Sequence, residues 1–129
     1  MDEKDLSLTE AEWQVMECLW ESAPRTGREL AEELAERRGW TRSTSLTLLR
    51  RLEAKGAVSS RDRGKIKVFR PLVSREDAAL RETEDLLSKA YRGSLSLLVS
   101  SFTENRELSG QELEELRAIL KGLEGKNDA

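Results

Sequence analysis

The sequence predicts a fold that is mainly α with a small β-hairpin. Apolar residues recur at helical spacing over most of the 129 residues, and several of these stretches open with Ser or Thr followed three residues later by Glu. Over residues 57–70 the pattern changes from helical to extended, around a polar turn. Charged residues make up 36% of the chain and hydrophobic residues 37%, which fits a globular protein rich in helix.

The first two helices share one start signal. Thr9-Glu10-Ala11-Glu12 fits a capping box, in which the Thr side chain accepts from the first turn and the Glu side chain reaches back. A helix of about 10–22 is predicted to follow it. Thr26-Gly27-Arg28-Glu29 repeats the box and opens a second helix, which Gly39 stops.

The third helix is predicted at 42–55, with Thr41 as its cap and Gly56 at its end. Its polar and apolar residues separate onto two faces. The inner face consists of Ser45, Leu48, Leu49 and Leu52. We expect core or interface positions for the three tryptophans, Trp13, Trp20 and Trp40.

A β-hairpin follows. Residues 57–60 are predicted as its first strand and 65–70 as its second, with 61–64 as a polar turn that has Gly at its end. Side chains alternate between the two faces of a strand. In the second strand Ile66, Val68 and Arg70 therefore point one way, and Lys65, Lys67 and Phe69 point the other.

The remaining chain is predicted to be helical. Ser74 caps a helix that runs to about residue 92, and Gly93 marks a break. A helix of about 94–104 follows, and Ser109-Gly110-Gln111-Glu112 is a third capping box that opens the last helix.

These elements indicate two domains, 1–73 and 74–129. We expect the tail, 125–129, to be disordered.

Positive charge is concentrated in one part of the chain. The net charge is −3 overall, but residues 1–24 carry one basic and seven acidic side chains, and 74–129 carry eight basic and twelve acidic ones. Residues 41–70 carry nine basic side chains against two acidic ones. A local excess of this kind is what binding to nucleic acid requires, because only charges that reach phosphates contribute. A basic face that is merely solvated is the other interpretation of the charge alone.

Three helices followed by a hairpin make the winged helix-turn-helix plan, with residues 74–129 as a C-terminal helical dimerisation arm. In this plan the third helix enters the major groove and its first residues meet the base edges. The predicted partner is therefore double-stranded DNA. The candidate DNA-binding residues are Arg42, Ser43, Thr44, Thr47, Arg50 and Arg51 on the helix, and Arg61, Arg63, Lys65 and Lys67 on the hairpin. For Arg51 an intramolecular ion pair is the alternative.

Catalysis and metal binding have little support in the sequence. The chain has no His and one Cys, Cys18, and it lacks the usual nucleophile and phosphate-loop motifs. We expect no enzyme activity, no cofactor and no metal site. No apolar run approaches the roughly 20 residues of a membrane span, so no membrane insertion is expected. The single Cys suits a reducing cytosol and a cytoplasmic location.

The arm is predicted to form a homodimer. Its 56 residues are divided by Gly93, and three short helices of that size bury too little surface alone to be stable. Packing against an identical copy removes this difficulty, and two modules held together can read a palindrome. The residues expected at the dimer interface are Leu87, Tyr91, Leu95, Leu98, Val99, Phe102, Leu113, Leu116 and Leu120.

The chain resembles the penicillinase and methicillin-resistance repressors, the BlaI/MecI family. The resemblance rests on motifs along nearly the whole chain: Leu8 to Trp13, Trp40-Thr41, Arg51 to Gly56, Gly64 to Pro71, Tyr91 to Leu95 and Leu108 to Leu113. It implies a dimeric repressor that blocks promoters containing a TACA/TGTA-type palindrome.

The same resemblance implies a sensor protease that triggers cleavage inside the arm. The cleaved Asn-Phe pair of those proteins aligns with Ser101-Phe102, where this chain keeps only the Phe. The alternative function is a winged-helix protein-interaction module that does not bind DNA directly.

Overall fold

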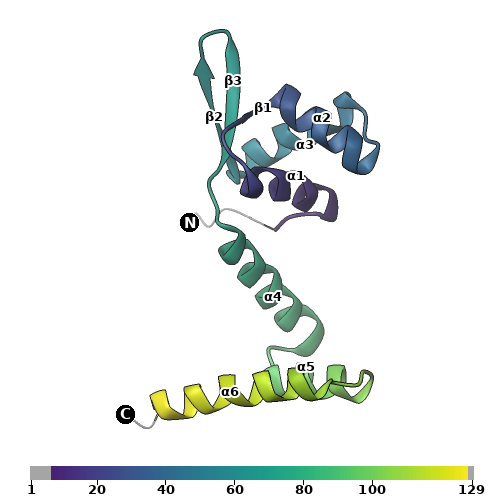
Figure 1. Cartoon of the computed structure of the whole chain (residues 1–129), viewed down its shortest axis with the longest axis vertical. Helices are drawn as coiled ribbons and strands as arrows, with labels where there is room; N and C mark the ends of the chain where they lie inside the picture. Colours follow the sequence, from purple (N-terminus) through teal and green to yellow (C-terminus); the bar gives the residue numbers. More distant parts are fainter. Residues whose placement is uncertain (1–6, 128–129) are drawn as a thin grey trace. The chain divides into compact units, whose positions relative to one another are not determined.

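The computed structural model describes residues 7–127 and has the mainly helical fold with a small sheet that the sequence predicts. Its elements are α1 (Glu10–Glu21), β1 (Arg25–Thr26), α2 (Gly27–Arg38), α3 (Arg42–Lys55), β2 (Val58–Arg63), β3 (Ile66–Pro71), α4 (Arg75–Tyr91), α5 (Leu95–Glu104) and α6 (Gly110–Asn127), as Figure 1 shows. The chain divides into two compact units, Met1–Asp85 and Leu86–Ala129, which meet within α4. The domain boundary after residue 73 stays a prediction.

The first unit has one apolar core between α1, α2, α3 and the sheet. The amphipathic stripes of the three helices meet there, and the largest fully buried side chains include Met16, Leu19, Leu30, Leu34 and Leu52. The inner face predicted for α3 is confirmed, since Ser45, Leu48, Leu49 and Leu52 are all buried. This packing leaves the opposite face of α3 free for contacts outside the core.

The predicted capping boxes are present. The Thr9 amide donates to Glu12 Oε1 (2.9 Å) while the Glu12 amide donates to Thr9 Oγ1 (3.1 Å). Thr26 and Glu29 repeat this reciprocal pair at 2.8 and 3.0 Å. Each box satisfies backbone N–H groups that a helix start leaves without partners, so short side-chain signals fix where α1 and α2 begin.

The sheet has three strands in the order β1-β3-β2, all antiparallel. The sequence analysis missed β1, because two residues, Arg25 and Thr26, carry no alternation to recognise. β1 delivers the chain directly into α2. At the first position of α2, a Cβ on Gly27 would lie 3.1 Å from Leu46 Cδ2, so glycine allows α2 to begin close against α3.

The hairpin is longer than predicted. The sequence indicated a turn at 61–64, but β2 continues to Arg63, which pairs with Ile66, and the turn is Gly64-Lys65. The exposed end of a strand is held by backbone hydrogen bonds, so it needs no apolar side chains to mark it. Gly64 has a φ of +67°, the left-handed conformation that glycine adopts without strain.

The second unit contains α5, α6 and the end of α4. α5 agrees with its predicted range, and Ser94 is its N-cap. The prediction of a disordered tail was wrong for residues 125–127, which continue α6, while residues 128–129 lie outside the described part of the chain. None of the helices described over 7–127 is long and apolar enough to cross a membrane.

Candidate nucleic-acid interface

The start of α3 presents short polar side chains. Arg42, Ser43 and Thr44 are exposed, and Thr47 is half-buried one turn later. The Thr44 amide donates to Thr41 Oγ1 (3.1 Å), and the Thr41 hydroxyl donates to Thr44 Oγ1 (3.0 Å). Because the Thr44 hydroxyl acts as an acceptor there, its own hydrogen stays available to an outside acceptor. The cap therefore both begins the helix and orients Thr44.

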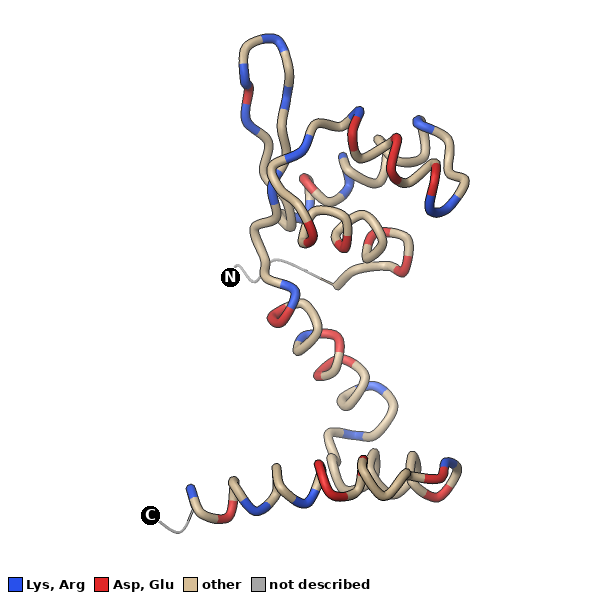
Figure 2. Tube along the Cα trace, in the orientation of Figure 1, with Lys and Arg blue, Asp and Glu red and all other residues tan. Residues whose placement is uncertain are grey.

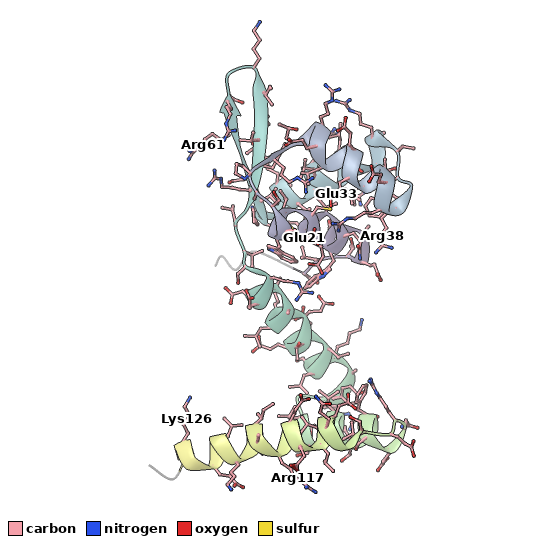
Figure 3. All side chains as sticks on the ribbon, viewed as in Figure 1. Glu21, Glu33, Arg38, Arg61, Arg117 and Lys126 are labelled. Atoms are coloured by element: carbon pink, nitrogen blue, oxygen red, sulfur yellow. The ribbon has the colours of Figure 1, made fainter. Side chains whose placement is uncertain are left out.

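The predicted DNA-binding cations of α3 and the hairpin make no ion pair or hydrogen bond within the described part of the chain. They are all exposed: Arg42, Arg50, Arg51, Arg61, Arg63, Lys65 and Lys67. Figure 2 shows basic residues along both strands and at the tip of the hairpin, and Figure 3 shows the Arg61 side chain extending away from the strands. Such side chains lose no internal partner on meeting a phosphate.

Several cations elsewhere in the first unit are paired within the molecule, whereas Arg38 and Arg81 make no ion pair with the described residues. Glu33 binds both Arg25 and Arg37, and Arg37 also binds Glu21 (2.6 Å). Arg28 pairs with Glu32 on α2, and Arg75 of α4 pairs with Glu17. The free positive charge is thus more concentrated on α3 and the hairpin than the sequence counts imply.

Lys55 illustrates the difference between charge and availability. It belongs to the basic segment 41–70, yet its Nζ donates to Glu12 Oε1 (2.6 Å) and to the Ser7 carbonyl (2.7 Å). Burial raises the pKa of the Glu12 carboxyl, but the hydrogen bonds from Lys55 and Thr9 outweigh it and hold that pKa below its usual value. Lys55 therefore serves the fold.

The strand register sorts the hairpin side chains onto two faces. Arg61 lies opposite Val68 and Arg63 opposite Ile66, so these four share one face. Asp62 lies opposite Lys67 on the other face. Ile66 is 55% exposed despite its apolar side chain, because it lies next to the turn, beyond the reach of the core.

Arg70 is a candidate that the sequence analysis left out of its site. It is exposed, makes no ion pair with the described residues, and lies two positions after Val68 on the face of Arg61 and Arg63. The alternation of the strand already placed Arg70 on the side of Val68. The sequence analysis counted the positive charge of Arg70 in the basic segment, but the strand register is what places it on the same face as Arg61 and Arg63.

The candidate dimer residues lie on apolar surfaces that the second unit leaves open. Leu95, Val99, Phe102, Leu113, Leu116 and Leu120 are exposed, and Leu87, Tyr91 and Leu98 are half-buried. The Ser101–Phe102 bond lies within α5. The Asn105 side chain donates to the Ser101 carbonyl (2.8 Å), and the Arg106 guanidinium lies 5.0 Å from the centre of the Phe102 ring.

Metal-binding and reactive groups add nothing to this surface. Within residues 7–127, no three His, Cys, Asp or Glu side chains are grouped so as to hold a metal ion. Cys18 is buried in α1, and this burial raises the pKa of its thiol. A buried thiol of raised pKa is a poor nucleophile.

Comparison with known proteins gives a consistent result. A family described as penicillinase repressor matches residues 8–122. The methicillin resistance regulatory protein MecI of Mammaliicoccus sciuri is 34% identical over 120 residues, covering 93% of this chain and 98% of MecI. The penicillinase repressor of Bacillus licheniformis is 33% identical over 114 residues, covering 88% of this chain and 89% of that protein.

Two solved structures extend the comparison to the fold. The DNA-binding domain of the repressor BlaI matches with a TM-score of 0.53 and 28% identity, covering 60% of this chain and 93% of that domain. Bacillus licheniformis BlaI, solved as a monomer in complex with the blaP half-operator, matches with a TM-score of 0.51 and 28% identity, over the same shares of both chains. The chain therefore belongs to the penicillinase repressor family.

Proposed function

We propose that this protein is a sequence-specific transcriptional repressor that binds an operator in duplex DNA through α3 and the hairpin. The observation that carries the proposal is the set of exposed cations gathered on these two elements, none of which forms an ion pair or hydrogen bond with the described residues. It is supported by family membership and by the related BlaI, which was solved with a half-operator. As a repressor acting by occupancy of DNA, the protein needs no catalytic group.

The two elements take different roles in the proposal. Arg42, Ser43, Thr44 and Thr47 enter the major groove, where short hydroxyls allow close approach to base edges. Arg50, Arg51 and the hairpin cations contact phosphates, which positions the protein without reading sequence. A change at Thr44 should therefore alter the preferred sequence, whereas a change at a hairpin cation should weaken binding to all sequences alike.

The repressor is proposed to act as a homodimer in the cytoplasm, on a palindromic operator. The exposed apolar residues of α5 and α6 support this, because surfaces of this kind are characteristic of protein interfaces. Two copies related by a two-fold axis present two DNA-binding domains to two half-sites.

The test begins with sites selected by the wild-type protein from genomic fragments, followed by anisotropy titrations over a series of salt concentrations. Arg63→Gln should reduce the slope of log affinity against log salt by about one and leave the ranking of sequences unchanged. Lys121→Gln, which removes an exposed cation of α6, is the matched control and should change neither quantity.

The outcome also separates the alternative function. If the wild-type protein binds duplexes no more tightly than an inert protein does at low salt, the proposal is wrong and the protein-interaction module is favoured. Equal slopes for the wild type and Arg63→Gln would remove the hairpin from the interface while leaving DNA binding by α3 in place.

A sensor protease is the proposed partner for induction. The Ser101–Phe102 bond lies in a helix, and proteases bind their substrates in extended form, so the end of α5 would have to unwind before cleavage. Mass spectrometry of the repressor from induced cells tests this partner, because cleavage would produce a fragment beginning at Phe102.

A further inference from the structure

The start of α3 is built differently from the starts of α1, α2 and α6. Those three helices have Glu at their third position, where Glu12, Glu29 and Glu112 complete capping boxes. In α3 this position holds Thr44. The Thr41 hydroxyl still accepts from the Thr44 amide (3.1 Å), but its own hydrogen is donated to Thr44 Oγ1 (3.0 Å). The exchange of Glu for Thr keeps a carboxylate away from this helix start and joins two hydroxyls instead.

The surroundings of Thr41 give this bond its direction. The Thr41 carbonyl accepts from the amide of Ser45 (3.1 Å), and the preceding residue, Trp40, packs against the apolar core. The backbone of Thr41 is therefore held on both sides. Hydrogen bonds in a chain strengthen one another, so a hydroxyl that accepts from an amide becomes a better donor. Thr41 thus orients the Thr44 hydroxyl.

The Thr44 hydroxyl keeps its hydrogen for a partner outside the molecule. Thr83 of α4 and Thr103 of α5 donate theirs to backbone carbonyls four residues earlier, at 2.9 and 2.8 Å. Thr44 makes no such donation within residues 7–127, and its side chain is exposed. Since a β-branched side chain has few rotamers, the bond from Thr41 also limits where the Thr44 oxygen lies.

We infer that Thr41 is a positioning residue for operator recognition: by donating to Thr44 it makes Thr44 a hydrogen-bond donor, so that α3 selects a base with an acceptor on its major-groove edge. The inference rests on the proposed function, since it needs α3 in the major groove. The acceptors there are N7 of the purines, O6 of guanine and O4 of thymine. The donors are the amino groups of adenine and cytosine, which a donating Thr44 leaves without a partner.

The experiment uses the full-length protein and three variants. In Thr41→Asn the capping atom is a carbonyl oxygen, which accepts from the Thr44 amide but cannot donate to the Thr44 hydroxyl. Asn is as good a cap as Thr and adds no charge. Thr41→Ser keeps the hydroxyl and is the matched control. Thr44→Val keeps the shape of the side chain, and the base pair at which its preference departs from that of wild type is the one that Thr44 contacts.

Anisotropy titrations then compare the selected operator with operators carrying one altered base at that position. Some analogues lack one acceptor, such as a deazapurine without N7, and others lack one donor, such as purine without the adenine amino group. Wild type and Thr41→Ser should lose affinity by about five- to tenfold when the contacted acceptor is removed, the worth of one hydrogen bond, and by less than about twofold when a donor is removed.

Thr41→Asn should lose less than about twofold with the same acceptor removed, because the Thr44 hydrogen turns to the Asn oxygen. Its salt dependence should equal that of wild type, since no charge has changed. Each comparison is between duplexes bound by one protein, so a change in the stability of the variant would not imitate this pattern.

Three results would overturn the inference. The first is an acceptor dependence in Thr41→Asn equal to that of wild type, which would mean that Thr41 only caps the helix. The second is a wild-type protein indifferent to every acceptor at the position that Thr44 contacts. The third is a Thr44→Val variant with unchanged sequence preference. In all three the proposed function stands, because wild type still binds its operator. A wild-type protein that binds no duplex would refute the proposed function instead.

Discussion

Ser45 is a hydroxyl enclosed among the leucines of α3. Its side chain is 2% exposed, and its Oγ has no hydrogen-bond partner among the described residues. A buried polar group without a partner costs more than an apolar one of similar size. We expect Ser45→Ala to raise the free energy of unfolding by about 1 kcal/mol, measured by urea denaturation.

Ser60 provides the matched control for this prediction. Its hydroxyl donates to Glu53 Oε2, so Ser60→Ala removes a bond that is made and should be neutral or destabilising. A loss of stability in Ser45→Ala similar to that of Ser60→Ala would show that the Ser45 hydroxyl is satisfied in solution.

Glu12 makes the stability of the first unit dependent on pH. The pKa of its carboxyl is lowered in the folded protein from the ordinary value of 4.5, so its ionised form stabilises the fold above that value. This contribution is lost as the pH falls through the lower, folded pKa. Glu12→Gln should therefore be less stable than wild type at neutral pH, and the difference should shrink below about pH 4.

Urea titrations of both proteins between neutral pH and pH 3 measure that difference. Glu10→Gln, an exposed neighbour on α1, serves as the control and should track wild type. If the difference in unfolding free energy between wild type and Glu12→Gln stays constant with pH, the Gln side chain is destabilising for steric reasons and the charge of Glu12 has no role.

At the scale of elements, α4 ends in an unusual way at its junction with α5. The Gly93 amide donates to the Leu87 carbonyl (2.9 Å), six residues back, and Arg92 has left-handed backbone with a φ of +53°. Left-handed backbone costs a non-glycine residue about 1–2 kcal/mol. Arg92→Gly should remove this cost. Glycine is also freer in the unfolded chain, which offsets part of the gain, so we expect the free energy of unfolding to rise by about 0.5–1 kcal/mol, measured by thermal denaturation.

Gly93 tests the same idea in the opposite direction. Its φ is +80°, and a Cβ added there would meet no atom within 4 Å, so Gly93→Ala isolates backbone strain from crowding. Gly93→Ala should lower the stability by about 1 kcal/mol. An unchanged melting temperature in both variants would show that the junction adopts a different conformation in solution.

For the whole molecule, the prediction concerns the apolar surface of α6. Leu116 and Leu120 are exposed and lie on one stripe of the helix, where a second copy is proposed to pack. Replacing both by Lys should give monomers at micromolar concentration, make the melting temperature independent of protein concentration, and weaken binding to the palindrome by about 100-fold. Light scattering and anisotropy measure these outcomes.

Leu97→Lys is the matched control for the arm. Leu97 is also exposed, but it follows Leu95 by two positions and so lies on another side of α5 from the stripe of Leu95, Leu98, Val99 and Phe102. The Leu97→Lys variant should remain dimeric. A wild-type protein that is monomeric at micromolar concentration would contradict the dimer itself.

The sequence by itself determined where the helices begin, which faces of them are apolar, and where positive charge gathers. Capping boxes such as Thr9–Glu12 act within four residues, and amphipathic stripes within two turns, so these features are local and can be recognised without the fold. The same locality made the order of three helices and a hairpin recognisable, and with it the candidate residues of α3 and the hairpin.

Only the tertiary structure decided how distant residues use their side chains. Lys55 and Arg70 lie in the same basic segment, but a carboxylate 43 residues away binds Lys55, while the strand register leaves Arg70 free. β1, the length of the hairpin and the ion pair between Arg75 and Glu17 likewise depend on pairings across long stretches of chain. Such pairings depend on which surfaces the folded core brings together, and no local pattern of residues records them.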